Sequence, residues 1–316
     1  MESTEPGPSQ CSRTGESLAK ADAPARAAAE PGPIRPLTLA DLPAALRLSV
    51  SASWNQNDSD WRTMLQLGQG FGIDAIDSEG QTQLAASLIV LPYGEHFAWT
   101  SMVLVLPEFQ RRGYAQQLLR FVLPYLASQG RVAVLDATPA GHAVYMQQGF
   151  QDTWGFARYR REANAPPPGQ REGPPTRALQ GHDWPAIEAM DAPAFGASRL
   201  PLLRVLAQRL PQAARVAEQG GRVCGFVLGR DGREACQIGP LLADDDATAT
   251  SLLHDALQTL DAAVYVDLLD RQRQLLPWLE RRGFALQRPF TRMVHGAGTA
   301  PGNPSIIVLA AGPELG

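Results

Sequence analysis

The sequence has few cysteines, a single lysine and no apolar run long enough to span a membrane. Cys11, Cys224 and Cys236 are too few and too scattered for a disulfide framework, which favours a reducing compartment. Lys20 is the only lysine, and the net charge of -4 argues against a dedicated nucleic-acid-binding protein. Because no stretch approaches the roughly 20 continuous apolar residues of a spanning helix, we expect no membrane segment.

The N-terminal region differs in composition from the rest of the chain. Residues 1–32 are rich in Ala, Pro, Ser, Gly and Glu without periodicity, which predicts a disordered tail. The region lacks the charged and then apolar pattern of a signal peptide, and its acidic residues argue against a transit peptide. We therefore expect a cytoplasmic protein. The acidic residues are Glu2, Glu5, Glu16, Asp22 and Glu30.

The rest of the chain is long enough for two domains. A Pro- and Gly-rich stretch, residues 163–175, predicts a stiff, solvated linker between a unit of residues 33–162 and a unit of residues 176–316. Apolar patterns in the first unit predict both strands and helices. The expected strands are residues 72–77, 82–91, 98–105, 132–136 and 150–158, and the expected helices include residues 115–128 and 139–148.

The second unit repeats the pattern of the first. The apolar run 263–267 parallels the run 132–136, and the segment 276–284 parallels the segment 142–150, each ending in Gly-Phe. A unit of this length found twice predicts two similar domains, not a solenoid.

Residues 110–115 form the most informative segment of the chain. They follow the apolar run 102–106 and open an apolar-periodic segment, so they predict a strand, a tight turn and a helix. The first turn of a helix presents unpaired N–H groups and the positive end of its dipole to an anion. Gly113 lets the backbone approach a ligand, and Arg111 and Arg112 add donors suited to phosphate. The segment indicates a pyrophosphate site, with a solvated turn as the alternative from these residues alone.

The turn resembles the acyl-CoA-binding turn of GNAT-type N-acetyltransferases. Gln110, Gly113 and Ala115 fit the pattern Gln/Arg-x-x-Gly-x-Gly/Ala of that family. Residues 135–150 resemble the strand, short helix and Gly-Phe step that form the other wall of its acyl-CoA cleft, so the resemblance covers residues 34–160 in order. It implies an α/β fold of two tandem GNAT-like domains, each a mixed, mostly antiparallel sheet flanked by helices.

The resemblance also implies acetyl-CoA as co-substrate, with no metal. The backbone of the strand before the turn is expected to hydrogen-bond the pantetheine like an added strand, with a splay or bulge giving it room. One N–H of that strand is a candidate to polarise the thioester carbonyl. The candidate acetyl-CoA-binding residues are Val103, Leu104 and Val105 on the strand and Gln110, Arg111, Arg112, Gly113, Tyr114 and Ala115 in the turn.

Tyr145 matches the tyrosine that donates a proton to the leaving sulfur in this family, so the resemblance implies a general acid here. The alternative is a packing role on a short amphipathic helix. No strong base stands on the strand at residues 98–101, where some family members have a carboxylate. Glu95 and His96, just upstream, are candidates for the base, and the alternative is that they lie in a surface turn. We therefore expect a water relay to remove the proton of the amine.

The loop that begins at Trp54 covers the acceptor side in this architecture. Trp54, Asp58 and Asp60 are therefore candidates to bind the acceptor, which we expect to be a small-molecule amine held between the domains. The two aspartates either hold a cationic amine or, in the case of Asp58, cap a helix.

The second unit departs from the family pattern at both positions that matter. Asp244, Asp245 and Asp246 replace the Arg- and Gly-containing turn and would repel a pyrophosphate, and Leu279 aligns with Tyr145. Asp267 is either a contributor to the acceptor pocket or a structural residue at a strand end. The segment 278–293 resembles the degenerate C-terminal domain of a group of two-domain bacterial acetyltransferases. We therefore expect one acetyl-CoA site per chain, in the first domain.

Two other functions fit the same residues. A catalytically silent acyl-CoA-binding or sensing module is the alternative from a different class, and the missing carboxylate on the strand keeps it open. A protein-modifying acetyltransferase differs only in its acceptor. A closed pocket between the domains would favour a small amine, and an open acidic groove would favour a protein.

Overall fold

The structure is a computed structural model that describes residues 32–163, 171, 173–296 and 298–316. The predicted tail lies outside the described residues apart from Gly32, and so does most of the predicted linker, residues 164–170 and 172. Everything below concerns the described residues, which belong to one compact unit.

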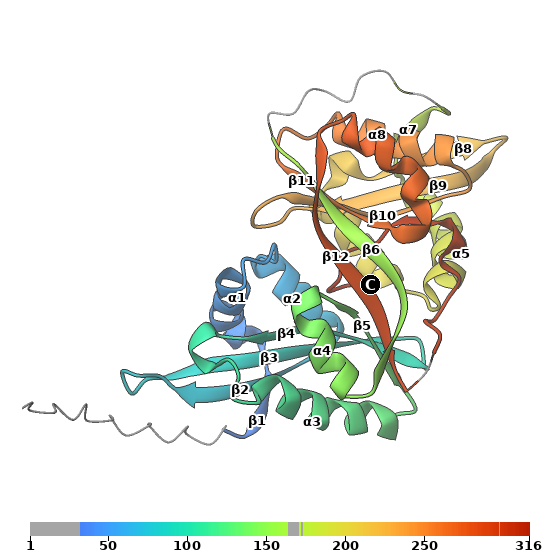
Figure 1. The fold of residues 1–316 in the computed structure, drawn as a ribbon. Coiled ribbons are helices and arrows are strands. Elements are labelled where there is room, and N and C mark those ends of the chain that lie inside the picture. The colour runs from blue at the N-terminus through green and yellow to red at the C-terminus, as the bar shows by residue number, and fades with distance from the viewer. Residues whose placement is uncertain (1–31, 164–170, 172, 297) are drawn as a thin grey trace, which may run out of the picture. The chain divides into compact units, whose positions relative to one another are not determined.

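The core of the fold is a mixed sheet of 13 strands within the described part of the chain, shown in Figure 1. Its order is β1-β2-β3-β4-β5-β12-β6-β11-β13-β10-β9-β8-β7. The strands are β1 (Ile34–Leu37), β2 (Gln69–Ile76), β3 (Thr82–Tyr93), β4 (Phe97–Val105), β5 (Val132–Ala137), β6 (Phe150–Arg161), β7 (Thr176–Ala178), β8 (Arg215–Gln219), β9 (Arg222–Arg230), β10 (Cys236–Ala243), β11 (Val264–Leu269), β12 (Phe284–His295) and β13 (Ile307–Leu309).

Local sequence signals account for where the helices start. At α2, Asn57 accepts a hydrogen bond from the Asp60 N–H while the Asp60 carboxylate accepts from the Asn57 N–H, which is a capping box. At α4, the Thr138 hydroxyl accepts from the Gly141 N–H, and Pro139 is the first helical residue. The helices are α1 (Leu42–Ser51), α2 (Asp58–Leu67), α3 (Tyr114–Ser128), α4 (Pro139–Gln147), α5 (Trp184–Phe195), α6 (Leu200–Arg209), α7 (Asp246–Leu257) and α8 (Leu276–Glu280).

The two halves of the chain exchange strands at the centre of the sheet. Strand β12 from the second half lies between β5 and β6 of the first half, and β6 in turn pairs with β11 of the second half. Figure 1 shows β6 and β12 running side by side through the middle of the sheet. The sequence predicts two separate units, and this pairing joins them into one continuous sheet.

Strands β4 and β5 diverge after a short parallel pairing. Residues 97–99 pair with residues 132–134, and beyond Trp99 the described residues supply β4 with no further partner on that side. On the other side of β4, Ser87 pairs with Leu104 and Ile89 with Ser101, so β4 has an extra residue there, and Met102 has a φ of 50°. This bulge and the divergence leave the edge of β4 from residue 100 onward open to a ligand.

The second half has the same divergence, but its own chain fills it. Strands β10 and β11 pair in parallel over residues 236–238 and 264–266 and then separate. Strand β13 inserts between them, with Leu309 opposite both Leu241 and Leu268. The gap that stays open between β4 and β5 is thus closed between β10 and β11.

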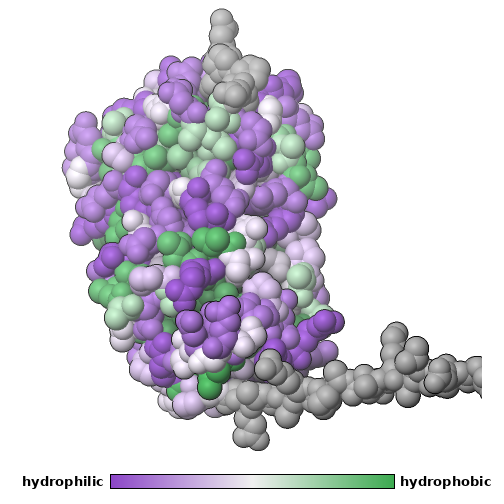
Figure 2. Space-filling view, turned by 90° about the vertical axis from the view of Figure 1, so that its left-hand side faces the viewer, coloured by the Kyte–Doolittle hydropathy of each residue, from purple (hydrophilic) through white to green (hydrophobic). Residues whose placement is uncertain are grey.

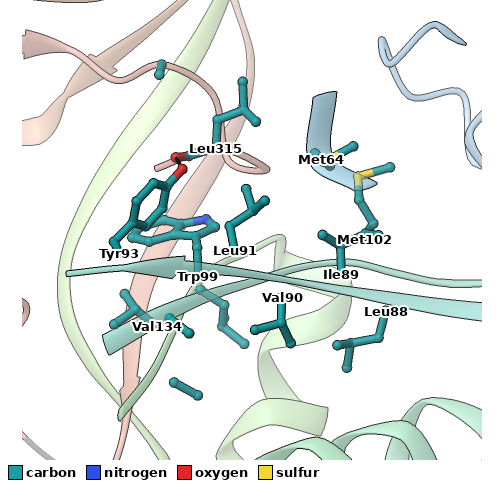
Figure 3. Close-up of a cluster of buried hydrophobic side chains, with 14 of the residues drawn as sticks. Met64, Leu88, Ile89, Val90, Leu91, Tyr93, Trp99, Met102, Val134 and Leu315 are labelled. Carbon is teal, nitrogen blue, oxygen red and sulfur yellow. Dashed lines mark hydrogen bonds between the residues drawn. The ribbon is translucent and has the colours of Figure 1, made fainter. Parts of the chain in front are cut away.

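The segment after β13 crosses back to the first half. The Tyr93 hydroxyl donates to the Leu315 carbonyl at 2.8 Å, and the Trp99 indole donates to the Pro313 carbonyl at 2.9 Å. Figure 3 shows Leu315 beside Tyr93, with Trp99 next to it. Phe195 packs edge-on against Tyr93 with ring centroids 4.8 Å apart, so both halves share one core cluster. These contacts fix Glu314 between the halves.

The outer surface is mixed in polarity. On the face in Figure 2, hydrophilic residues predominate and apolar residues lie between them in small groups. None of the helices in the described ranges is both long enough and apolar enough to cross a membrane.

Candidate active site

A cavity with about 450 Å³ of empty space lies beside the open edge of β4. The first half lines it with residues 54–56, residues 100–103 of β4 and Tyr145 on α4. Arg288 on β12 and Glu314 line it from the second half. The cavity thus receives side chains from both halves of the chain.

The turn of residues 110–115 has the backbone of an anion site. Arg111 and Gly113 have φ angles of 61° and 84°, and Gly113 is the residue immediately before α3. A Cβ atom built on Gly113 meets no atom within 4 Å, so the space above this backbone is open. A surface groove runs from here along the start of α3 to Gln147 and Gln148 at the end of α4. A pyrophosphate would meet free N–H groups at this helix start.

The side chains of the turn divide into exposed and anchored groups. Gln110 and Arg111 are exposed, and the Gln110 amide donates to the Val105 carbonyl at 3.2 Å. The Arg112 guanidinium donates to the Glu108 carbonyl at 2.7 Å and lies over the Phe109 ring. The Tyr114 side chain is buried against Phe109, so of this predicted acetyl-CoA-binding residue only the backbone can face a ligand.

Tyr145 lines the cavity, in a position from which its hydroxyl can donate a proton to a bound molecule. Its ring packs on Gly141, one helical turn earlier, and on Phe150, with ring centroids 5.8 Å apart. Burial raises the pKa of the Tyr145 phenol, which keeps the hydroxyl protonated. Within the described residues this hydroxyl makes no hydrogen bond, so its proton is available to a molecule in the cavity.

The structure separates the three residues predicted to bind the acceptor. Trp54 lines the cavity, but Asp58 and Asp60 do not. Asp58 is half exposed and pairs with Arg62 at 3.1 Å. Asp60 is buried, because the capping box turns it inward, and it accepts from Arg230 at 3.0 Å and from Arg209. The helix cap is Asn57, not Asp58.

Asp136 and Glu314 are the carboxylates that line the cavity, and the sequence indicated neither. Arg292 donates to both oxygens of Asp136, at 2.9 and 3.0 Å, so Glu314 is the carboxylate that keeps an oxygen for a ligand. Its side chain is buried, and one oxygen accepts a hydrogen bond from Arg230. Burial opposes ionisation of Glu314, but the charges of Arg230 and Arg158 outweigh it and lower its pKa. Its Oε2 atom makes no hydrogen bond to any described residue. No local pattern around residue 314 could indicate this role, because the insertion of β13 between β10 and β11 brings Glu314 to the cavity.

Two arginines face the cavity from the paired strands β6 and β12. Arg158 donates to both oxygens of Asp267, at 2.8 and 2.7 Å. Asp267 is fully buried and outside the lining, so its role is to hold Arg158. Arg288 lies directly opposite Arg158 in the register and forms no ion pair with a described carboxylate. Its Nε atom is buried without a hydrogen-bond acceptor.

The other base candidates lie elsewhere. Glu95 and His96 are exposed in the turn between β3 and β4, outside the cavity lining. The histidine on α4, His142, pairs with Asp152 at 2.8 Å and also lies outside that lining. Thr100 and Ser101 do line the cavity, and their hydroxyls lack hydrogen-bond partners in the described structure.

The corresponding turn of the second half lacks the features of an anion site. Helix α7 begins at Asp246, and the Asp245 carboxylate accepts from the Thr248 N–H at 2.7 Å. A carboxylate therefore already occupies the helix start where an anion would bind.

Comparison with known proteins identifies the family. Two family models, both described as "Acetyltransferase (GNAT) domain", match residues 76–152 and residues 187–307. The chain therefore belongs to the GNAT acetyltransferases and carries two such domains in tandem. The predicted α/β fold of two tandem GNAT domains is confirmed.

Relatives along most of the chain agree with this assignment. The "Uncharacterized N-acetyltransferase YitH" of Bacillus subtilis (strain 168) is 21% identical over 240 residues, which are 76% of this chain and 83% of that protein. The crystal structure of a putative acetyltransferase from Pyrococcus horikoshii shares the fold with a TM-score of 0.73 and 21% identity, over 90% of this chain and 95% of that one. A tandem GNAT protein from the clavulanic acid biosynthesis pathway has a TM-score of 0.59 and 14% identity, over 83% and 97%.

Proposed function

We propose that this protein is an N-acetyltransferase that moves the acetyl group of acetyl-CoA to a primary amine of a small molecule, with Tyr145 as general acid. One observation carries the proposal: the open edge of β4 and Tyr145 line the same cavity. In a family of acyltransferases, a hydrogen-bonding strand edge next to a protonated phenol supports acetyl transfer with Tyr145 as the acid.

The residues around the divergence of β4 and β5 fit acetyl-CoA. The free backbone edge of β4 at Val103, Leu104 and Val105 offers N–H and C=O groups to the pantetheine, as an added strand would. The turn at Arg111, Arg112 and Gly113 offers backbone N–H groups and guanidinium donors to the pyrophosphate. Bound there, acetyl-CoA supplies the thioester.

The chain's own groups supply the proton transfers. The Tyr145 hydroxyl, kept protonated by burial, donates to the sulfur that leaves. The hydroxyls of Thr100 and Ser101 and the amide of Gln56 offer unpaired polar atoms that can hold an ordered water. Such a water relays the proton that the amine gives up.

The shape of the cavity supports a small acceptor. Both halves of the chain enclose it, and the segment that contains Glu314 forms part of its wall. A protein-modifying enzyme would need an open groove for a polypeptide.

Release of the CoA thiol, measured with acetyl-CoA and a panel of small primary amines, tests the proposal. We expect at least one amine to raise thiol release about tenfold or more above the amine-free rate. Binding of acetyl-CoA in calorimetry without thiol release for any amine would favour the alternative of a silent acyl-CoA-binding or sensing module. Absence of both binding and release would overturn the donor assignment.

A further inference from the structure

The cavity contains an unusual set of buried polar atoms without partners. These are Gln56 Oε1, Thr100 Oγ1, Ser101 Oγ, Arg288 Nε and Glu314 Oε2. Buried polar atoms in folded proteins are nearly always hydrogen-bonded, so five at one cavity indicate the polarity of a molecule that binds there. The set includes one cationic group and one anionic group.

The wall formed by β6 and β12 carries excess positive charge. Arg158 and Arg288 are cross-strand neighbours, and like charges in this position repel each other. Asp267 neutralises Arg158 through two hydrogen bonds. No described carboxylate lies within ion-pair distance of Arg288, and its guanidinium rests over the Phe290 ring. The pairing thus leaves one guanidinium charge for an anion in the cavity.

The wall formed by the segment after β13 carries excess negative charge. Glu314 shares its partner Arg230 with Asp60, so two buried carboxylates meet one buried guanidinium. Arg209 also pairs with Asp60 but bonds Asp231 as well, and it makes no ion pair with Glu314. Glu314 Oε2 is the oxygen of this cluster that lines the cavity without a partner.

We propose that the acceptor is a small zwitterion, an amino acid or a close analogue, whose carboxylate binds Arg288 and whose amine binds Glu314. The proposal rests on the proposed acetyl transfer and specifies its substrate class. A planar guanidinium binds a carboxylate with two parallel hydrogen bonds, and a buried carboxylate binds an ammonium group. Each end of the molecule thereby contacts an atom, Arg288 Nε or Glu314 Oε2, that makes no hydrogen bond to a described residue.

The same arrangement gives the amine proton a destination. When the amine nitrogen bonds to the acetyl carbon, the carbon–sulfur bond breaks and Tyr145 protonates the sulfur. The amine binds as an ammonium group, so its nitrogen loses two protons in all: the first passes to Glu314 Oε2 and on to solvent before the attack, and the second returns through the ordered water to the Tyr145 oxygen after it. The net change is one proton to the CoA sulfur and one to solvent, and no further reactant is needed.

The experiment compares matched pairs of acceptors in the wild-type chain. Thiol release is measured with acetyl-CoA and a panel of amino acids, each beside the amine of the same skeleton without its carboxylate. We expect kcat/KM for the preferred amino acid to exceed that of its matched amine about tenfold or more, because a charge-assisted bidentate contact is lost. This comparison needs no variant, so it does not depend on how a substitution affects folding.

Two variants then test which residue binds the carboxylate of the acceptor and which binds its amine. Arg288→Gln should raise KM for the amino acid about tenfold while leaving KM for the matched amine within about twofold. Glu314→Gln should lower kcat for both compounds, because both contain the amine. Arg271→Gln, at an exposed arginine outside the cavity, is the charge-matched control and should change neither value.

The outcomes separate this inference from the proposed function. If matched amines react as well as amino acids, or Arg288→Gln raises KM for both equally, the zwitterion proposal is wrong and acetyl transfer stands. If neither class reacts although acetyl-CoA binds, both the zwitterion proposal and transfer to a small amine are wrong.

Discussion

Tyr145→Phe is expected to lower kcat about 10²- to 10⁴-fold, the range for loss of a positioned general acid. The change removes one oxygen atom and leaves the ring, so its contacts with Gly141 and Phe150 persist. Because we propose that acetyl-CoA binds to β4 and to the turn before α3, its Kd in calorimetry should stay within about twofold. Steady-state kinetics with acetyl-CoA and a reactive amine measure the effect.

Gly141→Ala separates a role in proton donation from simple packing. A Cβ atom at position 141 would lie 2.9 Å from Cε2 of Tyr145, so the ring must shift. Alanine is also the better helix former by about 1 kcal/mol, so α4 itself should not be weakened. We expect kcat to fall in this variant although the hydroxyl is still present. Full activity in Tyr145→Phe would show that Tyr145 only packs.

Arg230→Met is expected to lower the free energy of unfolding by about 3–5 kcal/mol, because it leaves buried carboxylates without their cation. Arg230 is fully buried and bonds both Asp60 and Glu314. Asp60 comes from the first half, and Glu314 lies beyond β13, so this one guanidinium joins distant parts of the chain. Chemical denaturation monitored by fluorescence measures the change.

The matched control is the triple variant Arg230→Met, Asp60→Asn, Glu314→Gln, which removes the charges together. Since it leaves no unpaired buried carboxylate in this group, it should recover part of the lost stability. Arg62→Met, at the exposed pair with Asp58, should cost less than about 1 kcal/mol. If Arg230→Met and Arg62→Met lowered the free energy of unfolding equally, the claim that Arg230 stabilises the fold by joining Asp60 to Glu314 would be wrong.

Local patterns were sufficient to predict much of the first half. The turn of residues 110–115, the helix after it and the short helix that carries Tyr145 each depend on nearby signals, such as glycine placement and apolar spacing. The repeat along the chain likewise indicated two similar domains. Helix α6 was not predicted, although its apolar face is buried at Leu202, Leu203 and Leu206.

Pairing between strands that are distant in the sequence creates the parts of the site that the sequence did not indicate. The exchange of β6 and β12 places Arg288 opposite Arg158, which are far apart in the chain. The insertion of β13 carries Glu314 into the cavity, and nothing near residue 314 distinguishes it from a surface glutamate. Asp60 was singled out as a carboxylate near the acceptor, but two arginines already bind it. Such pairings depend on tertiary contacts that no short motif encodes.

The second half lines the cavity and lacks the two features that we propose for acetyl-CoA binding in the first half. Strand β13 fills the gap between β10 and β11 that would correspond to the open edge of β4. Asp245 occupies the start of α7, where an anion would otherwise bind. Both features support the prediction of one acetyl-CoA site per chain, next to Tyr145.

Titration of acetyl-CoA into the full chain in a calorimeter tests this central claim most directly. The account predicts a stoichiometry of one acetyl-CoA per chain, with binding weakened about tenfold or more by Arg112→Glu, which reverses a charge in the turn. A stoichiometry of two, or binding that Arg112→Glu leaves unchanged, would contradict it.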